Sequence, residues 1–356
     1  MAFAYPGPTN VYIPTVELSG NLNINFTRNQ KDFPVNKLIK LIPVTKEAGF
    51  YRYFNPNDEA RVSGPISSGI VQQNVWAPGN MRPINGGHTR SFENRAYATL
   101  RRSFDQTLEL RSTQQADFDL LRMTTDGLGR DAMTDRAIEA AALVTASASY
   151  PSTHVDTATN FGGGFWSAGT AANPYIKKTM FNLANKIFLD SAGNVKQDNL
   201  VLVMNPNTAR QVATSQEVHT IFTNTAGLTD KLLTMQGAVG PKDAIYYGVP
   251  ENLYGSRVVI EDTTYVPYNR GSSSEVQAYV FPDNTAAMIS VEKEFVGSEA
   301  AMTYSTFSMF VYSPDDFKIE TFTDQKNRLM QILLTDNRQV LATAGVTGGL
   351  ITNLFS

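Results

Sequence analysis

The best candidate for a ligand site lies where the apolar run 200–204 stops at Asn205-Pro206-Asn207 and a helical pattern follows. Many α/β proteins hold a phosphate or an activated nucleophile at such a junction between a buried strand and a capped helix. A phosphate site needs a glycine-rich turn with free N–H groups, whereas the proline at this junction has none. The sequence also contains no Walker pattern and no Gly-x-Ser-x-Gly elbow. The junction therefore lacks the groups that such a site requires.

Other residue types that carry chemistry are scarce or scattered. The three histidines, His88, His154 and His219, stand far apart in sequence and form no His-x-x-x-His pair. The chain has no cysteine, which excludes disulfides, thiolate zinc sites and cysteine nucleophiles. Asp315-Asp316 follows a proline and is typical of a turn. The sequence thus predicts no catalytic residue, no metal site and no cofactor.

The composition indicates contact with other protein surfaces. Of the 356 residues 42% are hydrophobic and only 18% are charged, and the net charge is -3. A surface rich in uncharged polar residues suits extensive protein contact, and the weak negative charge gives no electrostatic case for gripping nucleic acid. No apolar run approaches the length of a membrane span, and the first ten residues do not form a secretory signal.

Arginines are concentrated between positions 90 and 111, with acidic residues among them. They are Arg90, Arg95, Arg101, Arg102 and Arg111, interspersed with Glu93, Asp105 and Glu109. We favour a partly paired protein surface over a DNA-binding patch. A third interpretation is ion pairing between subunits, because arginine makes bidentate contacts with carboxylates.

The first hundred residues are predicted to be extended. Residues 1–45 alternate polar and apolar side chains and contain several prolines, which favours an arm that lies on another surface. Residues 46–98 are expected to form a β-hairpin, with residues 69–80 as the returning strand and turn residues between the strands.

The predicted hairpin carries aromatic residues on both faces. Tyr51 and Tyr53 would lie on one face of its first strand, with Phe50, Arg52 and Phe54 on the other. A two-stranded hairpin alone is marginally stable in water. Its aromatic residues, Trp76 included, therefore need a covering surface, either the body of this chain or a neighbouring subunit.

A helix is expected between residues 112 and 146, with Ser112 and Gln115 as a capping box. Gly127 and Gly129 interrupt its pattern, so either one long bent helix or two shorter ones would fit. A long irregular loop is expected from 150 to 170.

The second half of the sequence predicts alternating helices and strands. One helix would start at its cap Asn173 and stop at Gly193. A second would follow the strand 200–204 and turn Ala209 and Val212 inward. Further strands are expected at 257–262, 276–281 and 286–291, and the last segment predicts a long antiparallel strand pair that ends near Gly345.

In order and spacing, these parts resemble the major capsid proteins of tailed bacteriophages, the Hong Kong 97-type fold. "GFYRYFN…RVSG…APGN" resembles that family's extended loop, and "DFDLLRMTTDGLGRDAMTDRAIEAAALV" resembles its spine helix. "NLVLVMNPNTARQVATSQEVHTIF" resembles part of its axial domain, and the terminal "NRLMQILLTDNRQVLATAGVTGGLITN" resembles the closing strands of its peripheral domain. The likeness covers nearly the whole chain and rests on order and spacing, because each signature is degenerate.

The resemblance implies an α+β, Hong Kong 97-like major capsid fold divided into five parts. They are an N-terminal arm (1–45), an extended loop (46–98), a first part of the peripheral domain with the spine helix (99–172), an axial domain (173–311) and a second part of the peripheral domain (312–356). In such a fold the strand–helix junction at 199–215 would be scaffold.

The resemblance also implies a structural function without enzymatic activity. The chain would self-assemble into pentamers and hexamers of an icosahedral shell around double-stranded DNA, without sequence-specific binding. It would be assembled in the host cytoplasm and become part of the virion. Implied partners are a separate scaffolding protein, a portal and, as an option, a decoration protein. The candidate inter-subunit contacts are Tyr51, Tyr53, Trp76, Arg101 and Arg102.

In the founding member of the fold, a lysine on the extended loop forms an isopeptide bond to a neighbouring subunit. Here no lysine lies between Lys46 and Lys177, so the resemblance predicts a shell without such cross-links. Two alternatives stay open: an encapsulin-like shell around a protein cargo, and a soluble α/β enzyme or binding protein.

Overall fold

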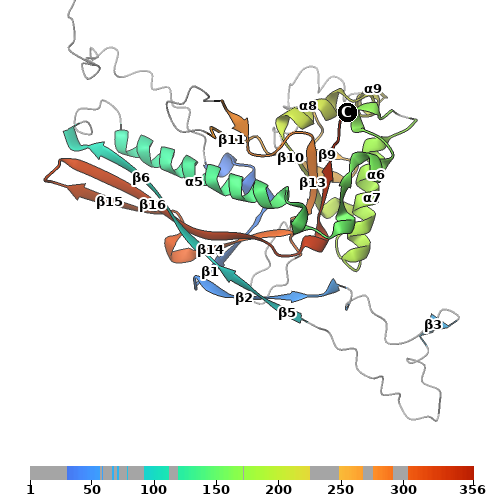
Figure 1. The fold of residues 1–356 in the computed structure, drawn as a ribbon, viewed down its shortest axis with the longest axis horizontal. Helices are drawn as coiled ribbons and strands as arrows, with labels where there is room; N and C mark the ends of the chain where they lie inside the picture. Colours follow the sequence, from blue (N-terminus) through green and yellow to red (C-terminus); the bar gives the residue numbers. More distant parts are fainter. Residues whose placement is uncertain are drawn as a thin grey trace, which may run out of the picture.

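In a computed structural model of the chain, one long helix lies between two β-sheets, and a β-hairpin lies below them in the view of Figure 1. The structure describes residues 30–56, 58, 66–67, 70–71, 78, 92–111, 119–170, 172–224, 248–267, 276–291 and 304–356. The α-helices in these ranges are α2 (Val35–Leu38), α5 (Leu120–Val144), α6 (Ala158–Gly162), α7 (Tyr175–Asp190), α8 (Pro206–Thr214) and α9 (Gln216–Asn224).

The strands of the described ranges are β1 (Lys40–Val44), β2 (Ala48–Phe54), β3 (Ile66–Ser67), β4 (Ile70–Val71), β5 (Phe92–Ala98), β6 (Leu100–Glu109), β7 (Val155–Thr157), β8 (Leu200–Met204), β9 (Asn252–Leu253), β10 (Ser256–Ile260), β11 (Thr264–Tyr265), β12 (Ala278–Tyr279), β13 (Thr285–Ser290), β14 (Phe307–Tyr312), β15 (Lys318–Asp324), β16 (Leu329–Ala342) and β17 (Gly349–Thr352). Short 3₁₀ turns include η1 (Gln30–Asp32) and η7 (Ser313–Asp315).

A six-stranded sheet in the order β7-β17-β13-β8-β10-β9 is covered on both faces. Strand β8 is buried along its whole length, which is the reason for its continuous apolar sequence. Leu200, Leu202 and Met204 face one core with α7 and α8, whereas Val201 and Val203 face a second core with α5 and α2. The predicted strand 200–204 and the helix after it are confirmed, and Ala209 and Val212 of α8 are fully buried.

Helix α7 packs on this sheet with the predicted apolar stripe. It ends at Asp190, and the predicted stop residue Gly193 follows three positions later with a φ of 80°, in the left-handed region, and donates its N–H to the Phe188 carbonyl at 2.8 Å. The stripe, Ile176, Met180, Leu183 and Ile187, is fully buried. The prediction that Asn173 caps this helix is wrong.

The cap of α7 comes from a distant part of the chain. Its N-cap residue is Pro174, which makes no side-chain capping bond. Instead the buried Glu217 of α9 accepts hydrogen bonds from the N–H groups of Ile176 and Lys177 at 2.9 and 3.0 Å. A carboxylate at this end of a helix satisfies otherwise unpaired donors and suits the helix dipole.

Helix α5 is one continuous helix through both glycines, as the single-helix alternative predicted. Its 25 residues span about 37 Å. It starts later than expected, because Asp119 caps it by accepting from the Arg122 N–H at 3.0 Å. The expected capping-box residues, Ser112 and Gln115, lie outside the described residues.

The second sheet runs β1-β14-β16-β15, with β6 on the other edge of β16. Helix α5 lies along it (Figure 1), and Leu128 and Ala132 pack against Ile332 and Leu334 of β16. The predicted terminal strand pair is confirmed, since β15 and β16 are antiparallel from Lys318 opposite Thr335 to Asp324 opposite Leu329.

Two segments differ from the expectation of extended or irregular chain. Residues 30–45 form η1, α2 and β1, and Phe33, Val35 and Leu38 are buried in the core that also contains Met133 and Ala137 of α5, because apolar side chains are stabilised by such burial. Residues 1–29 lie outside the described residues. The segment 150–170 contains strand β7, which pairs with β17, and helix α6.

The predicted returning strand of the hairpin is wrong. The partner of β2 is β5, with Ala48 opposite Ala98 and Phe54 opposite Phe92, whereas Ile70–Val71 pairs with Ile66–Ser67. Strand β5 runs directly into β6, which is fixed along β16. The longer ladder of β6 on β16 therefore determines which segment returns beside β2.

Candidate functional site

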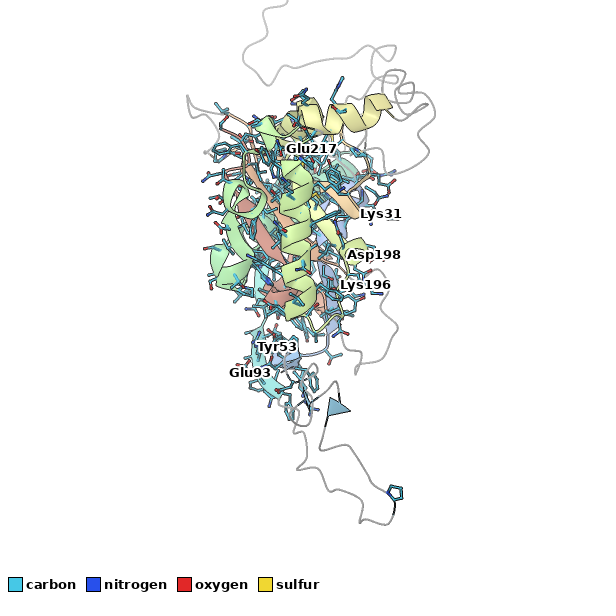
Figure 2. The ribbon with its side chains drawn as sticks, turned by 90° about the vertical axis from the view of Figure 1, so that its right-hand side faces the viewer. Lys31, Tyr53, Glu93, Lys196, Asp198 and Glu217 are labelled. Atoms are coloured by element: carbon cyan, nitrogen blue, oxygen red, sulfur yellow. The ribbon has the colours of Figure 1, made fainter. Side chains whose placement is uncertain are left out.

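The β2–β5 hairpin carries several exposed aromatic side chains. Figure 2 shows its residues Tyr53 and Glu93 at one end of the molecule and Glu217 near the opposite end. Side chains alternate along β2 between half-buried and exposed, so the hairpin has an inner and an outer face. As the sequence predicted, Tyr51 and Tyr53 share one face of β2 and Phe50, Arg52 and Phe54 the other, and the structure makes the tyrosine face the inner one.

The inner face of the hairpin packs against the chain's own body. Tyr97 of β5 stacks on Phe310 of β14 with ring centroids 4.7 Å apart, and Tyr51 lies 5.5 Å from the same ring. Arg95 lies 3.8 Å from the centre of the Tyr53 ring and bonds Glu93 at 2.9 Å. Partial burial raises the pKa of both Tyr51 and Tyr53. Tyr51 therefore contacts the chain's own body, whereas the contact of Tyr53 with Arg95 lies within the hairpin.

The outer face of the hairpin carries exposed aromatic side chains. Phe50 is 75% exposed, Phe92 54% and Phe54 36%. Phe54 and Phe92 are paired across the strands with centroids 6.1 Å apart, and Arg52 lies 5.3 Å from the Phe92 ring. Large apolar side chains grouped on a projecting arm are typical of a protein interaction surface.

Polar contacts fix the base of the hairpin to the second sheet. The backbone C=O of Glu47 accepts from the Thr99 N–H at 2.7 Å, and the Gln339 side chain accepts from the Ala98 N–H at 2.7 Å. The Glu47 carboxylate accepts from Asn337 at 2.9 Å and from Arg101 at 3.3 Å. These bonds determine the direction in which the hairpin leaves the body.

Behind this base, buried ions join α5 to β16. Asp336 is fully buried and accepts two hydrogen bonds from Arg136, at 2.9 and 2.6 Å, and one from Arg338. Although burial alone would raise the pKa of Asp336, hydrogen bonds and charge from the two arginines lower it below its usual value. Arg136 also bonds Asp316 at 2.8 Å.

The buried ions continue to β6. Arg338 reaches Asp135 at 2.6 Å and Glu139 at 3.2 Å, and Arg102 pairs with the same two carboxylates at 3.1 and 3.0 Å. We call the whole set the arginine–carboxylate network: Arg102, Asp135, Arg136, Glu139, Asp316, Asp336 and Arg338. It joins three elements that are remote in sequence, α5, β6 and β16.

The five candidate contact residues have different surroundings in the single chain. Arg101 pairs with Asp315 at 2.7 Å as well as with Glu47, and Arg102 belongs to the arginine–carboxylate network. The predicted partly paired surface thus holds for these two arginines, and a role of either between subunits stays a prediction. Trp76 lies outside the described residues.

The strand–helix junction after β8 serves the fold. Asn205 is fully buried, caps α8 by accepting from the Thr208 N–H at 2.8 Å, and donates to the backbone of Phe281 at 3.2 Å and to Asp283. Within the described ranges no three His, Asp or Glu side chains converge as metal ligands do. No helix in those ranges combines the length and apolar character needed to span a bilayer.

Comparison with solved structures identifies the architecture. The chain aligns with a phage-related protein from Bordetella bronchiseptica RB50 over 92% of its length and 93% of that chain, at 12% identity and a TM-score of 0.60. It aligns with a protein of Mycobacterium phage Bobi over 97% and 96% (8% identity, TM-score 0.53) and with the capsid of Cyanophage P-SCSP1u over 98% and 95% (11% identity, TM-score 0.51). The chain has a phage capsid fold. No family model and no curated protein matches the sequence.

The capsid fold confirms the predicted fold class, but some site residues were not predicted. Phe92 was not predicted because the returning strand was assigned to 69–80. Arg136 and Arg338 were not singled out, although Asp336 and Arg338 place two charges within a strand that is apolar on both sides of them, at 332–334 and 340–342. A charged residue inside such a strand indicates a buried ion pair, since buried charges need partners of opposite charge.

Proposed function

We propose that this chain is the major capsid protein of a tailed phage, which assembles into pentamers and hexamers of an icosahedral shell around double-stranded DNA. The outer aromatic face of the hairpin carries the proposal. It presents Phe50, Phe54 and Phe92 on an arm whose inner face is already packed on this chain. The capsid fold supports the same assignment.

The outer face is suited to bind a neighbouring copy. Burying a large aromatic side chain contributes about 2 to 3 kcal/mol, and three such side chains lie on one face of the hairpin. In a closed shell every subunit would repeat this contact, so a modest contribution per subunit stabilises the whole particle. The base contacts of Glu47 and Ala98 hold the arm in a fixed direction, which reduces the entropy lost on association.

The test is negative-stain microscopy of purified full-length protein and of two variants. We expect hollow polyhedra from the natural sequence and poor assembly from Phe50→Ser, with circular dichroism unchanged. Leu189→Ser is the matched control, because Leu189 is 65% exposed on α7, away from the hairpin. Small uniform particles from the natural sequence would contradict the shell. Normal shells from Phe50→Ser would exclude this face.

The contents of the particles separate a virion from a cargo compartment. Nuclease-protected double-stranded DNA in particles from infected cells would support the capsid, whereas an enclosed protein would favour the encapsulin-like alternative.

The proposal includes the five-part division of the chain, the absence of catalysis and assembly in the host cytoplasm. Its partners would be a scaffolding protein, a portal and an optional decoration protein. Tyr51, Tyr53, Trp76, Arg101 and Arg102 remain its candidate inter-subunit residues.

A further inference from the structure

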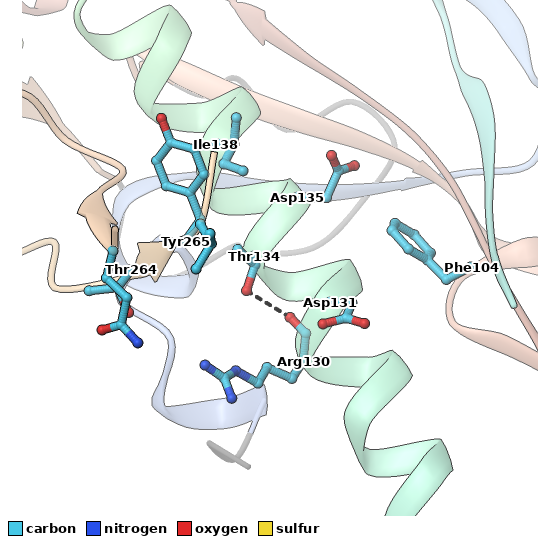
Figure 3. Close-up of a pocket in the computed structure, with 10 residues that line it drawn as sticks. Phe104, Arg130, Asp131, Thr134, Asp135, Ile138, Thr264 and Tyr265 are labelled. Atoms are coloured by element: carbon cyan, nitrogen blue, oxygen red, sulfur yellow. Dashed lines mark hydrogen bonds between the residues drawn. The ribbon is translucent and has the colours of Figure 1, made fainter. Parts of the chain in front are cut away.

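A groove of about 400 Å³ crosses the outward side of α5. Figure 3 shows Arg130, Asp131 and Ile138 on the helix, with Tyr265 on one side and Phe104 of β6 on the other. Two of its apolar side chains are substantially exposed, Val266 by 45% and Ile138 by 37%. The groove therefore offers an apolar end near Ile138 and a charged end near Arg130.

The charged end holds a carboxylate without a partner. The Asp131 carboxylate makes no hydrogen bond or ion pair with any residue that the structure describes, and partial burial raises its pKa despite the nearby charge of Arg130. A cationic side chain that entered the groove would relieve this cost.

The described part of the chain begins at this same end. Gln30 lies over Gly129, so closely that a Cβ on this glycine would be 2.1 Å from the Gln30 amide nitrogen. The Gln30 carbonyl accepts a hydrogen bond from Asn36 at 3.0 Å, which fixes the backbone at that point. The described chain therefore begins beside Gly129, the neighbour of Arg130 at the charged end of the groove.

The preceding sequence matches the groove in length and pattern. From Arg130 to Ile138 the helix advances about 12 Å, which about four extended residues cover. Leu22, Ile24 and Phe26 alternate with polar residues, and in an extended chain they would share one face. Arg28 has the same parity and would lie near Asp131.

We propose that residues 22–28 occupy this groove of their own chain as an extended segment. Leu22, Ile24 and Phe26 cover Ile138, Tyr265 and Val266, and Arg28 pairs with Asp131. The interaction ties the start of the chain to the long helix within one subunit. It does not depend on shell assembly.

Because the natural sequence has no cysteine, disulfide trapping tests the proposal directly. Full-length Phe26→Cys/Ile138→Cys and Ile24→Cys/Val266→Cys would be oxidised, run on a non-reducing denaturing gel, and mapped by mass spectrometry. Phe26→Cys/Leu189→Cys is the control, since Leu189 is exposed on α7. Thermal unfolding of the reduced proteins confirms that each variant is folded.

We expect at least one groove pair to form a disulfide at monomer mass about tenfold faster than the control, because docking raises the effective concentration of the two thiols. Adding Asp131→Asn should slow this reaction. Rates equal to the control for both groove pairs would overturn the proposal. Disulfides that join two chains would overturn it as well, because the occupant would then be a second copy.

Discussion

Alanine in place of Gly127 is expected to stabilise the subunit. Glycine inside a helix costs about 1 kcal/mol relative to alanine, because the unfolded chain loses more freedom on folding. Gly127 lies within α5, and a Cβ added there meets no atom within 4 Å. Since nothing offsets the gain, Gly127→Ala should raise the free energy of unfolding by about 1 kcal/mol.

Gly129, two residues further along the same helix, is the matched contrast. A Cβ there would lie 2.1 Å from the Gln30 amide nitrogen and 3.1 Å from its Cδ, so the Gln30 side chain must move. The loss of that contact offsets a gain of about 1 kcal/mol from helix propensity. Gly129→Ala alone should therefore be nearly neutral. In a Gln30→Ala background the same substitution should recover the full gain.

Urea unfolding of unassembled subunits, followed by circular dichroism, measures both effects. The four proteins with and without Gly129→Ala and Gln30→Ala form a double-mutant cycle, whose coupling energy isolates the contact. A destabilised Gly127→Ala protein would contradict a continuous helix at that position. Equal stabilisation by Gly127→Ala and Gly129→Ala would contradict the contact between the Gln30 side chain and Gly129.

Three further predictions concern the buried ions, the distant helix cap and the shell. Asp336→Asn should destabilise the subunit by about 3 kcal/mol or more, because Arg136 loses its closest partner in the core. The folded state lowers the pKa of Asp336. The stability that its ionised carboxylate contributes is therefore fully present above the unfolded-state pKa of about 3.9, and it is lost as the pH falls through the folded-state pKa. Urea unfolding measured from pH 7 to pH 3 should thus show the free energy of unfolding falling more steeply with pH for the natural sequence than for Asp336→Asn. Equal slopes for the two proteins would contradict this. Glu217→Gln should cost about 1–2 kcal/mol, since an amide cannot accept from both α7 N–H groups and the Tyr254 hydroxyl as the carboxylate does; unchanged urea unfolding would refute the long-range cap. Mature particles boiled in detergent should run as a single band at monomer mass, and a ladder of covalent oligomers would point to Lys46.

Local patterns predicted the elements that depend on nearby residues. The stripe of α7 and the β8–α8 junction follow from spacing and from one cap residue, Asn205, which the structure confirms. The alternation along β2 predicted that Tyr51 and Tyr53 share a face, because side chains in a strand alternate regardless of what covers them. The capsid fold was predictable from the order of such elements.

Contacts between residues far apart in sequence were not predictable in the same way. Asn173 has the type and position of a cap, yet Glu217, whose partner Ile176 lies 41 residues earlier, takes that role. The returning strand was misplaced because turn residues at 55–69 suggested a short hairpin. The structure instead pairs Phe54 with Phe92, since β5 continues into the ladder of β6 on β16.

The same distant contacts make the two faces of the hairpin unequal. Tyr51 and Tyr97 on the inner face pack against Phe310, which lies more than 200 positions later in the chain. The inner face is thus covered within the subunit. On the outer face the described residues leave Phe50 three-quarters exposed. An arm with one face held by its own body cannot collapse to hide the other. The outer face is therefore the part of the hairpin that a neighbouring copy would cover.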